Sequence, residues 1–338
     1  MRFGVFLPAG RFPEQSDGRA LARSVEAVRC AESAGFDDAW IAEHHFVPYG
    51  VCPSAITFAA HALGMTHRIA LGPAVTVLST AHPVAVAEQA SLVHEMSGGR
   101  LHLGVGRGGP WVDLEVFGTG VDRYERGFPE GLDLLLRGLN DERLSADGDH
   151  FSFREVPIVP LASRAGPPVT VACTSTGTVR EAAVRGLPML LGMHLGDAEK
   201  AGMVAQYAES SAAAGHDPNS VRHVSAVVGH VADDRAQAVS ELRETMPGWL
   251  SEGLAAHTPV DERPGPTRDP VAYTELLCEL HPVGSPDDCV DRLRSSVERT
   301  GVEHVVMMVE GAGTARRTSD NIARLGAEVL PRLRGELP

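Results

Sequence analysis

The strongest constraint on the fold is a repeated alternation of short β-rich runs with longer helical patterns. Eight such runs occur, each followed by a stretch with helical periodicity or helix-start signals, and they cover residues 3–7, 37–46, 69–78, 100–106, 169–173, 189–193, 223–231 and 303–309. Right-handed crossovers between parallel strands close into a barrel at eight units. We therefore predict an α/β protein, a (β/α)8 TIM barrel that forms a single domain over residues 1–338.

Two segments interrupt this alternation and are predicted as insertions after the fourth and seventh β/α units. Residues 140–168 are rich in Pro, Gly and Asp, and residues 246–286 are longer and contain few apolar residues. A long insert without regular structure is often an active-site lid, so residues 246–286 form a candidate lid. A solvated surface decoration is the alternative. Ser285 and Pro286 then predict the start of a further helix, because serine caps a helix and proline suits its first turn.

Composition narrows the setting and the partners. The 338 residues carry a net charge of -14, which leaves no basic face for nucleic acid. Five cysteines at scattered spacings, without a C-x-x-C pair, are typical of a reducing compartment. No segment reaches the ~20 apolar residues that span a bilayer, and no cleavage signal follows the first residues. We expect a cytoplasmic protein that binds neither membranes nor nucleic acid.

The helical patterns at 54–63 and after Pro83 are apolar almost all round. An outer barrel helix needs only one apolar face, so the opposite face is predicted to meet a second subunit. We therefore expect a homodimer that packs through these two helices. The apolar residues are Ala55, Ile56, Phe58, Ala59, Ala60, Ala62 and Leu63 in the first helix, and Val84, Ala85, Val86, Ala87, Ala90, Leu92 and Val93 in the second.

Glu43, His44 and His45 end the second β-rich run, where the chemistry of a TIM barrel is located. Adjacent residues of an extended chain point to opposite faces, so His44 and His45 are poorly placed to share a metal ion, and no metal site is predicted. One histidine should face the barrel mouth and the other a neighbouring layer. Imidazole titrates near neutrality, so the inward one is a candidate general acid/base. A hydrogen-bonded structural histidine is the alternative for each.

Two polar segments follow the fourth and fifth runs. GVGRGG, residues 104–109, matches G-x-G-x-x-G, but it does not open a helix and is not a dinucleotide site. Its glycines would let a flat ligand approach, and Arg107 adds a positive charge. TSTGT, residues 174–178, opens a helix and offers hydroxyl and N–H groups to a phosphate, although simple helix capping is the alternative. Together the two segments suggest a flat, phosphorylated cofactor across the barrel mouth.

These segments also resemble a known family. MRFGVFL, GFDDAWIAEHHF, LGPAVTVLSTAHPVAVAEQ, GRLHLGVGRG, VFGTG and RGLPMLL are similar to the bacterial luciferase-like flavin monooxygenases, in particular the luciferase α-subunit branch, from residue 1 to about 338. The resemblance implies a (β/α)8 barrel, reduced FMN delivered by a separate flavin reductase, and dioxygen activation as a 4a-hydroperoxyflavin. It also implies that His44 is the catalytic histidine and that His45 reaches toward the subunit interface, where Glu88 matches an interface acid.

The resemblance assigns further residues. Arg107, Ser175 and Thr178 match contacts to the flavin phosphate, and Ala74-Val75 matches a pair joined by a non-proline cis peptide under the flavin ring. Gly106 and Thr174 stand beside the flavin where luciferases carry a reactive cysteine and a glutamate, which makes bright emission doubtful. Arg126 lies near a second phosphate-binding arginine of the family. The residues expected near the substrate are His45, Trp111, Met193, His194 and Trp249.

The leading hypothesis is a two-component FMN-dependent monooxygenase that oxygenates an organic metabolite by hydroxylation, epoxidation or Baeyer–Villiger insertion. A deazaflavin-dependent hydride-transfer enzyme of the same fold is the first alternative, although its relatives carry an S-D-H-like segment at Glu43-His44-His45. A non-catalytic flavin-binding partner subunit is the second. The sequence leaves the substrate itself open.

Overall fold

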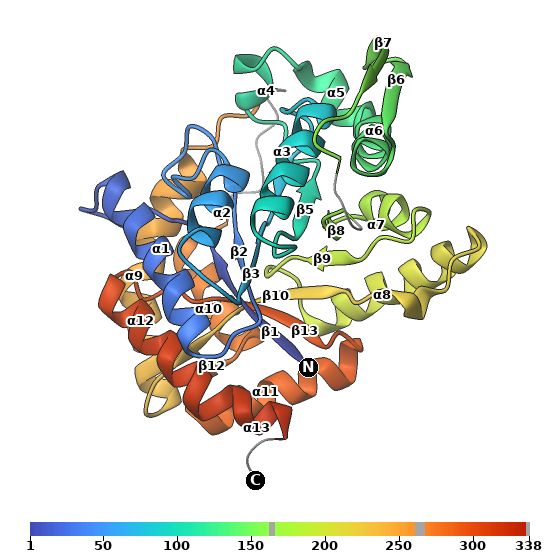
Figure 1. The fold of residues 1–338 in the computed structure, drawn as a ribbon. Coiled ribbons are helices and arrows are strands. Elements are labelled where there is room, and N and C mark those ends of the chain that lie inside the picture. Colours follow the sequence, from blue (N-terminus) through green and yellow to red (C-terminus); the bar gives the residue numbers. More distant parts are fainter. Residues whose placement is uncertain (162–165, 261–267, 336–338) are drawn as a thin grey trace.

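The structure, a computed structural model, describes residues 1–161, 166–260 and 268–335. Its centre is a barrel of parallel strands surrounded by helices (Figure 1). The strands follow the order β3-β2-β1-β13-β10-β9-β8-β5-β4. They are β1 (Arg2–Leu7), β2 (Asp38–Ile41), β3 (Ala70–Pro73), β4 (Thr76–Val77), β5 (Leu103–Gly106), β8 (Val169–Cys173), β9 (Met189–Leu191), β10 (Val224–Val228) and β13 (His304–Met308).

The two edges of this sheet come from one chain segment, which closes the barrel. β3 pairs with β2 and β4 pairs with β5, and only Ala74 and Val75 separate β3 from β4. The backbone N–H of Leu71 also donates to the carbonyl of Arg100 at 2.9 Å, and that of His102 donates to Leu71 at 2.9 Å. β3 and β4 therefore fill one barrel position, and the predicted barrel of eight strand positions is confirmed.

The outer layer follows the expected order of helices. They are α1 (Asp17–Ser33), α2 (Ala55–Leu63), α3 (Pro83–Met96), α6 (Phe128–Asn140), α7 (Thr176–Ala183), α8 (Asp197–Ala213), α9 (Arg235–Ala255) and α12 (Ala315–Arg324). Several start where the sequence predicts them, since Ser54 accepts from the backbone of Thr57 and Ser285 caps α11 (Pro286–Thr300). A π-helical turn (Leu325–Val329) and α13 (Leu330–Arg334) end the described chain.

Strand alternation divides the core into two layers. On β13 the side chains of Val305 and Met307 join the cluster between barrel and helices. Those of Val306 and Met308 join the second cluster, which includes Trp40. Successive side chains of a strand point to opposite faces, which explains this alternation between the two clusters. Both faces of the strands are thus mainly apolar, and polar side chains lie at the strand ends.

Two expectations about where elements begin and end need correction. The second strand ends at Ile41 and not at Phe46, because residues 42–46 leave the sheet. The helix expected over residues 124–139 is divided into α5 (Gly120–Arg126) and α6, with Gly127 between them and Pro129 in the first turn of α6. α5 follows a short helix, α4 (Asp113–Val116).

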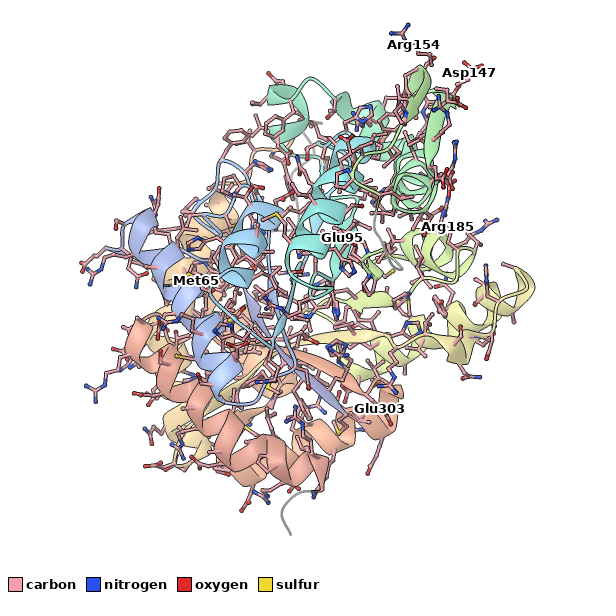
Figure 2. The ribbon with its side chains drawn as sticks, in the orientation of Figure 1. Met65, Glu95, Asp147, Arg154, Arg185 and Glu303 are labelled. Carbon is pink, nitrogen blue, oxygen red and sulfur yellow. The ribbon has the colours of Figure 1, made fainter. Side chains whose placement is uncertain are left out.

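The two inserts also contain regular structure. Residues 140–168 include a hairpin of β6 (Arg143–Asp147) and β7 (Ser152–Pro157), which carries Asp147 and Arg154 at the periphery (Figure 2). In the second insert α9 continues to Ala255 through Pro247, because Trp249 and Leu250 are buried in the core. α10 (Pro270–Leu280) follows, and β12 (Val283–Gly284) pairs with β11 (His230–Val231). Residues 162–165 and 261–267 of these inserts lie outside the described residues.

The predicted dimer helices are more buried than their composition suggests. On α2 the apolar residues pack within the chain, and only Ala60 among those predicted is exposed. On α3, Ala85 and Leu92 are exposed, and Met96 at its end is 78% exposed. The apolar excess of α2 is thus explained mainly by the barrel itself. In the described residues no helix is both long and apolar enough to cross a membrane.

Candidate active site

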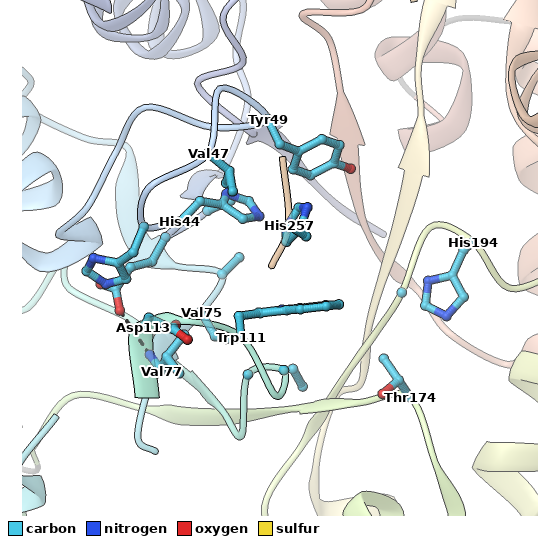
Figure 3. A pocket seen from close by; sticks show the side chains of 18 of the residues that line it. His44, Val47, Tyr49, Val75, Val77, Trp111, Asp113, Thr174, His194 and His257 are labelled. Atoms are coloured by element: carbon cyan, nitrogen blue, oxygen red, sulfur yellow. Dashed lines mark hydrogen bonds between the residues drawn. The ribbon is translucent and has the colours of Figure 1, made fainter. Parts of the chain in front are cut away.

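A cavity of about 510 Å³ opens where the barrel strands end at their carboxyl side. Figure 3 shows the rings of His44, Tyr49 and His257 on one side of this cavity, Trp111 across it, and His194 with Thr174 on the other side. Of the residues predicted from the sequence, the lining includes His44, His45, Ala74, Val75, Trp111, Thr174, Met193 and His194. The location is the one that the barrel architecture predicts.

His44 and His45 both line the cavity, which corrects the prediction that they face opposite layers. Alternation applies to an extended chain, and here the strand has already ended at Ile41. Glu43 holds the loop in place, since its carboxylate accepts the backbone N–H groups of Val77 and Ala55, each at 3.0 Å. Burial raises the pKa of Glu43, and these two hydrogen bonds oppose the rise.

The His44 ring is enclosed and uncharged. It meets the Tyr49 ring edge-on at 5.0 Å, and its Nδ1 is buried without a hydrogen-bond partner among the described residues. A Cβ on Gly50 would lie 2.5 Å from this Nδ1, so only glycine lets the ring take its position. Burial, with smaller contributions from His257 and His45, lowers the pKa of His44 to about 3. The neutral imidazole would become a useful base only if a bound anion offset the burial.

The opposite edge of the cavity consists of small residues on neighbouring strands. The peptide bond between Ala74 and Val75 is cis, as the family resemblance predicts. On β5, a Cβ at Gly106 would come within 2.7 Å of Val75 Cγ2, so Val75 fills the space that a side chain at 106 would need. Gly108 and Gly109 follow at the cavity edge. A flat ligand could approach this edge closely.

Arg107, Ser175 and Thr178 do not line the cavity themselves. They lie beside Thr174, which does. β5 and β8 are parallel neighbours, so Arg107 and Ser175 leave the barrel at the same end. Ser175 and Thr178 form a capping box at the start of α7, which confirms the helix-capping reading without excluding an anion. The guanidinium of Arg107 lies 4.4 Å from the Tyr124 ring centroid, and its Nε is buried without a partner in the described chain.

Arg126 and Trp249 also lie outside the described lining. Arg126 is exposed, and its Nε donates to Asp122 at 2.6 Å. Trp249 is 1% exposed, stacks on Tyr49 with ring centroids 4.8 Å apart, and donates to the Tyr49 carbonyl at 2.9 Å. Trp249 therefore supports a wall of the cavity from behind and does not contact its contents.

The roof joins two loops that are distant in sequence. The backbone N–H of Val112 donates to Thr258 at 2.9 Å, and that of Val260 donates to Pro110 at 2.9 Å. Trp111 lies between Pro110 and Val112 in the chain, and its ring centroid is 4.8 Å from that of His257. The described start of the candidate lid thus covers the cavity. Among the described residues no group of three His, Cys, Asp or Glu side chains is arranged to hold a metal ion.

Sequence reasoning missed three titratable residues of this lining: Tyr49, Asp113 and His257. Burial raises the pKa values of Tyr49 and Asp113 and lowers that of His257. Tyr49 follows the EHHF segment closely, and Asp113 follows GVGRGG, so proximity to strand ends was a usable signal. His257 offered no local signal, because it belongs to the predicted insert.

Met193 and His194 complete the wall after β9. The His194 ring packs on Gly192, where a Cβ would lie 2.7 Å from its Cε1. Burial lowers the pKa of His194, with a smaller contribution from Arg268. Behind this wall the buried His281 contacts the Met193 carbonyl through its Nε2 at 2.7 Å.

Comparison with known proteins shows which family the sequence matches. A family model described as luciferase-like monooxygenase matches residues 1–304. The alkanal monooxygenase alpha chain of Photorhabdus luminescens is 30% identical over 352 aligned positions, which cover 99% of this chain and 98% of that relative.

Solved structures show the same fold. Monooxygenase RslO1 from Streptomyces bottropensis superposes with a TM-score of 0.86 at 21% identity, covering 98% of this chain and 100% of that one. The oxygenating constituent of 3,6-diketocamphane monooxygenase from Pseudomonas putida, a type II Baeyer–Villiger monooxygenase solved with FMN, has a TM-score of 0.79 at 19% identity and covers 98% of each chain.

Proposed function

Because the chain belongs to the luciferase-like monooxygenase family, and is thereby a flavin-dependent monooxygenase, we propose that it uses reduced FMN and dioxygen to oxygenate an organic metabolite. A separate flavin reductase would supply the reduced FMN, in a cytoplasmic two-component system. The observation that carries this proposal is the cavity itself, which brings His44, the cis-linked Ala74-Val75 pair and the glycine-rich edge of β5 together.

The residues present fit FMN. A largely apolar cavity of about 510 Å³ is within the range that holds a ring system of this size, and Ala74, Val75, Gly108 and Gly109 line it. The start of α7 beside Arg107 suits a phosphate, because the first N–H groups of a helix lack intrahelical acceptors. The Nε of Arg107 has no partner among the residues that the structure describes, and an anion would satisfy it.

We assign the phosphate to Arg107, Ser175 and Thr178, and the ring to the edge formed by Ala74, Val75, Gly106 and Thr174. Arg126 would have to leave Asp122 before it could add a second contact to the phosphate. When bound, reduced FMN supplies the electrons that activate dioxygen. The protein's own residues orient the ring, exclude water and manage protons.

His44 is the proposed proton handler. Its ring lines the cavity, and Gly50 and Tyr49 restrict its position. Because burial keeps the imidazole neutral, His44 could accept a proton while negative charge is present beside it and return the proton once that charge is gone. The roof formed by residues 110–112 and 258–260 would exclude water during this exchange.

We also propose a homodimer through the exposed faces of α2 and α3. Five apolar residues are exposed on these helices and on the turn after α2: Ala85, Leu92, Met96, Ala60 and Met65. Met65 lies at the surface in Figure 2. The two helices contact each other, so these residues belong to adjacent elements. A partner copy would bury this surface.

The test is oxygenation by the purified protein with FMN, NADH, a general flavin reductase and labelled dioxygen, with mass analysis of candidate metabolites. We expect His44→Ala to bind FMN normally and to lose at least about 100-fold in oxygenation rate, the size of a general acid/base contribution. His216→Ala, at an exposed position after α8 and away from both the cavity and the proposed dimer surface, is the matched control and should not change the rate. Normal oxygenation by His44→Ala would contradict the assignment, and hydride transfer with a deazaflavin instead of FMN would contradict the proposed cofactor.

A further inference from the structure

His257 also lines the cavity, and the proposed function gives it no role. It follows the end of α9, and the residues after it are hydrogen-bonded to the loop that follows β5. Its side chain lines the cavity on the side of His44 (Figure 3). The backbone pairing of Thr258 with Val112 holds this position.

One hydrogen bond decides which ring nitrogen of His257 carries the proton. Nδ1 lies 3.0 Å from the backbone carbonyl of Gly253, and a carbonyl can only accept, so Nδ1 carries the hydrogen in the neutral ring. Nε2 is then an unprotonated acceptor. Among the described residues, the hydrogen bond of the His257 ring runs through Nδ1 and leaves Nε2 to a ligand. The cavity thus contains an oriented base.

Aromatic rings surround this base. The Trp111 ring lies 4.8 Å from the His257 ring at 56°, and the Tyr49 ring lies 6.0 Å away at 63°. Both aromatic side chains line the cavity. Such walls favour a flat aromatic ligand over an aliphatic chain, because offset and edge-on ring contacts add to the free energy of burial.

A carboxylate stands near enough to His257 to support its protonated form. Asp113 lines the same cavity, is only 7% exposed, and accepts a hydrogen bond from the backbone of Leu114 at 3.0 Å. Burial lowers the pKa of His257, whereas hydrogen bonds to Gly253 and Leu254 and the charge of Asp113 raise it. The lining that the structure describes contains no lysine or arginine that would oppose protonation.

We propose that the substrate is a hydroxylated aromatic compound and that His257 Nε2 accepts the hydrogen of its hydroxyl group. The inference rests on the proposed monooxygenase function and adds a substrate class and a second catalytic residue to it. In the step, the substrate O–H bond breaks and an N–H bond forms at Nε2, and the electron pair stays on the oxygen. The product pair is a phenolate and an imidazolium, and the negative charge of Asp113 favours the imidazolium. A phenolate ring is electron-rich, which suits attack by an electrophilic oxygen donor.

The experiment measures equilibrium binding without flavin, so that a failure of the oxygenase proposal does not affect its outcome. The probes are 1-naphthol and 1-methoxynaphthalene, which share a ring system and differ in the ability to donate a hydrogen bond. We expect the wild-type protein to bind 1-naphthol about 10-fold more tightly, the value of one buried hydrogen bond. In His257→Phe, which keeps a ring in place, the two affinities should become equal. His216→Phe, outside the cavity and exposed after α8, should keep the 10-fold preference.

Equal affinities in the wild-type protein, or a preference that persists in His257→Phe, would overturn the proposal. A thermal unfolding curve for each variant separates loss of the fold from loss of the acceptor. If His257→Phe does not fold, His257→Leu replaces it with the same expectation. Failure of 1-naphthol to bind the wild-type protein at all would also count against a hydroxylated aromatic substrate.

Discussion

Gly106 and Val75 are packed so closely that a Cβ at position 106 would come within 2.7 Å of Val75 Cγ2. Gly106 lies on β5 and Val75 belongs to the cis-linked pair between β3 and β4. Ala172 on β8 would be 3.4 Å from the same Cβ. The side chain of Val75 therefore occupies the space that a side chain at position 106 would need. A cysteine at position 106 would fit only beside a residue smaller than valine at position 75.

Gly106→Ala should lower the free energy of unfolding by about 1–3 kcal/mol, because the added methyl group overpacks a buried site. Chemical denaturation measures the change. In the double variant Val75→Ala with Gly106→Ala, the clash is relieved, so the loss should be smaller than the sum of the two single losses. Additive losses would show that the two positions do not compete for the same space.

Arg107→Ala should weaken FMN binding by about 10- to 100-fold, because a charge-assisted contact to phosphate is removed. Riboflavin lacks the phosphate and should bind wild type and variant alike. Calorimetry with both ligands makes the comparison. Arg126→Ala should have the smaller effect, since Arg126 is exposed and paired with Asp122. A loss with riboflavin as large as that with FMN would indicate damage to the site and not loss of a phosphate contact.

Asp38→Asn should lower the free energy of unfolding by about 3 kcal/mol, because breaking a buried ion pair leaves its partners uncompensated. The carboxylate is 1% exposed and accepts from Arg2 at 3.0 Å and Trp40 at 2.8 Å, with His304 Nε2 at 2.9 Å. The control is Glu155→Gln, whose ion pair with Arg143 is exposed and should contribute little.

The pH dependence of Asp38 follows from the same contacts. Burial alone would raise the pKa of Asp38, but His304 and Arg2 lower it to about 2. Since the folded pKa is depressed, the stabilisation is present above the ordinary value of 3.8 and is lost as the pH falls toward 2. Asp38→Asn should therefore unfold with a weaker pH dependence in this acidic range.

Mild acid should destabilise the protein through His281. Burial, assisted by Lys200, lowers the pKa of His281 to about 3 from an ordinary 6.5. Between these values the unfolded chain binds more protons than the folded one, so the free energy of unfolding falls as the pH drops below 6.5. The expected loss from this group is about 2 kcal/mol at pH 5.

His281→Gln tests this assignment, because glutamine does not titrate but retains an N–H group for the Met193 carbonyl. Urea unfolding at pH 7, 6 and 5 should give a smaller decrease for the variant than for the wild-type protein. Some decrease should remain, since burial also lowers the pKa values of His102 and His223 to about 4. Parallel curves would show that His281 is protonated equally in both states.

The barrel could be predicted from local pattern alone. Strands such as β8 (Val169–Cys173) and β13 are bounded by turn residues and have continuous apolar runs, and helix starts such as Ser54 and Ser285 carry their own caps. These signals depend on neighbouring residues in the chain. The Ala74-Val75 cis bond was predicted from family resemblance, because no local pattern indicates it.

Inserts and loops were predicted less well. The hairpin β6-β7 and the continuation of α9 through Pro247 depend on what the segments pack against. Burial of Met246, Trp249 and Leu250 in the second core outweighs the cost of a proline within the helix. The free energy gained by burying these side chains cannot be read from a local sequence pattern.

By itself the sequence determined the order of eight β/α units and the strand ends at which polar residues gather. It also indicated the family, through segments that include His44 and Arg107. Only the tertiary structure decided that His44 and His45 line one cavity, that Trp249 stands behind Tyr49, and that His257 reaches the site from a distant insert. The reason is physical: strand and helix periods arise between near neighbours, whereas the position of a loop depends on contacts with segments far away in the chain. Those contacts exist only after the barrel has formed.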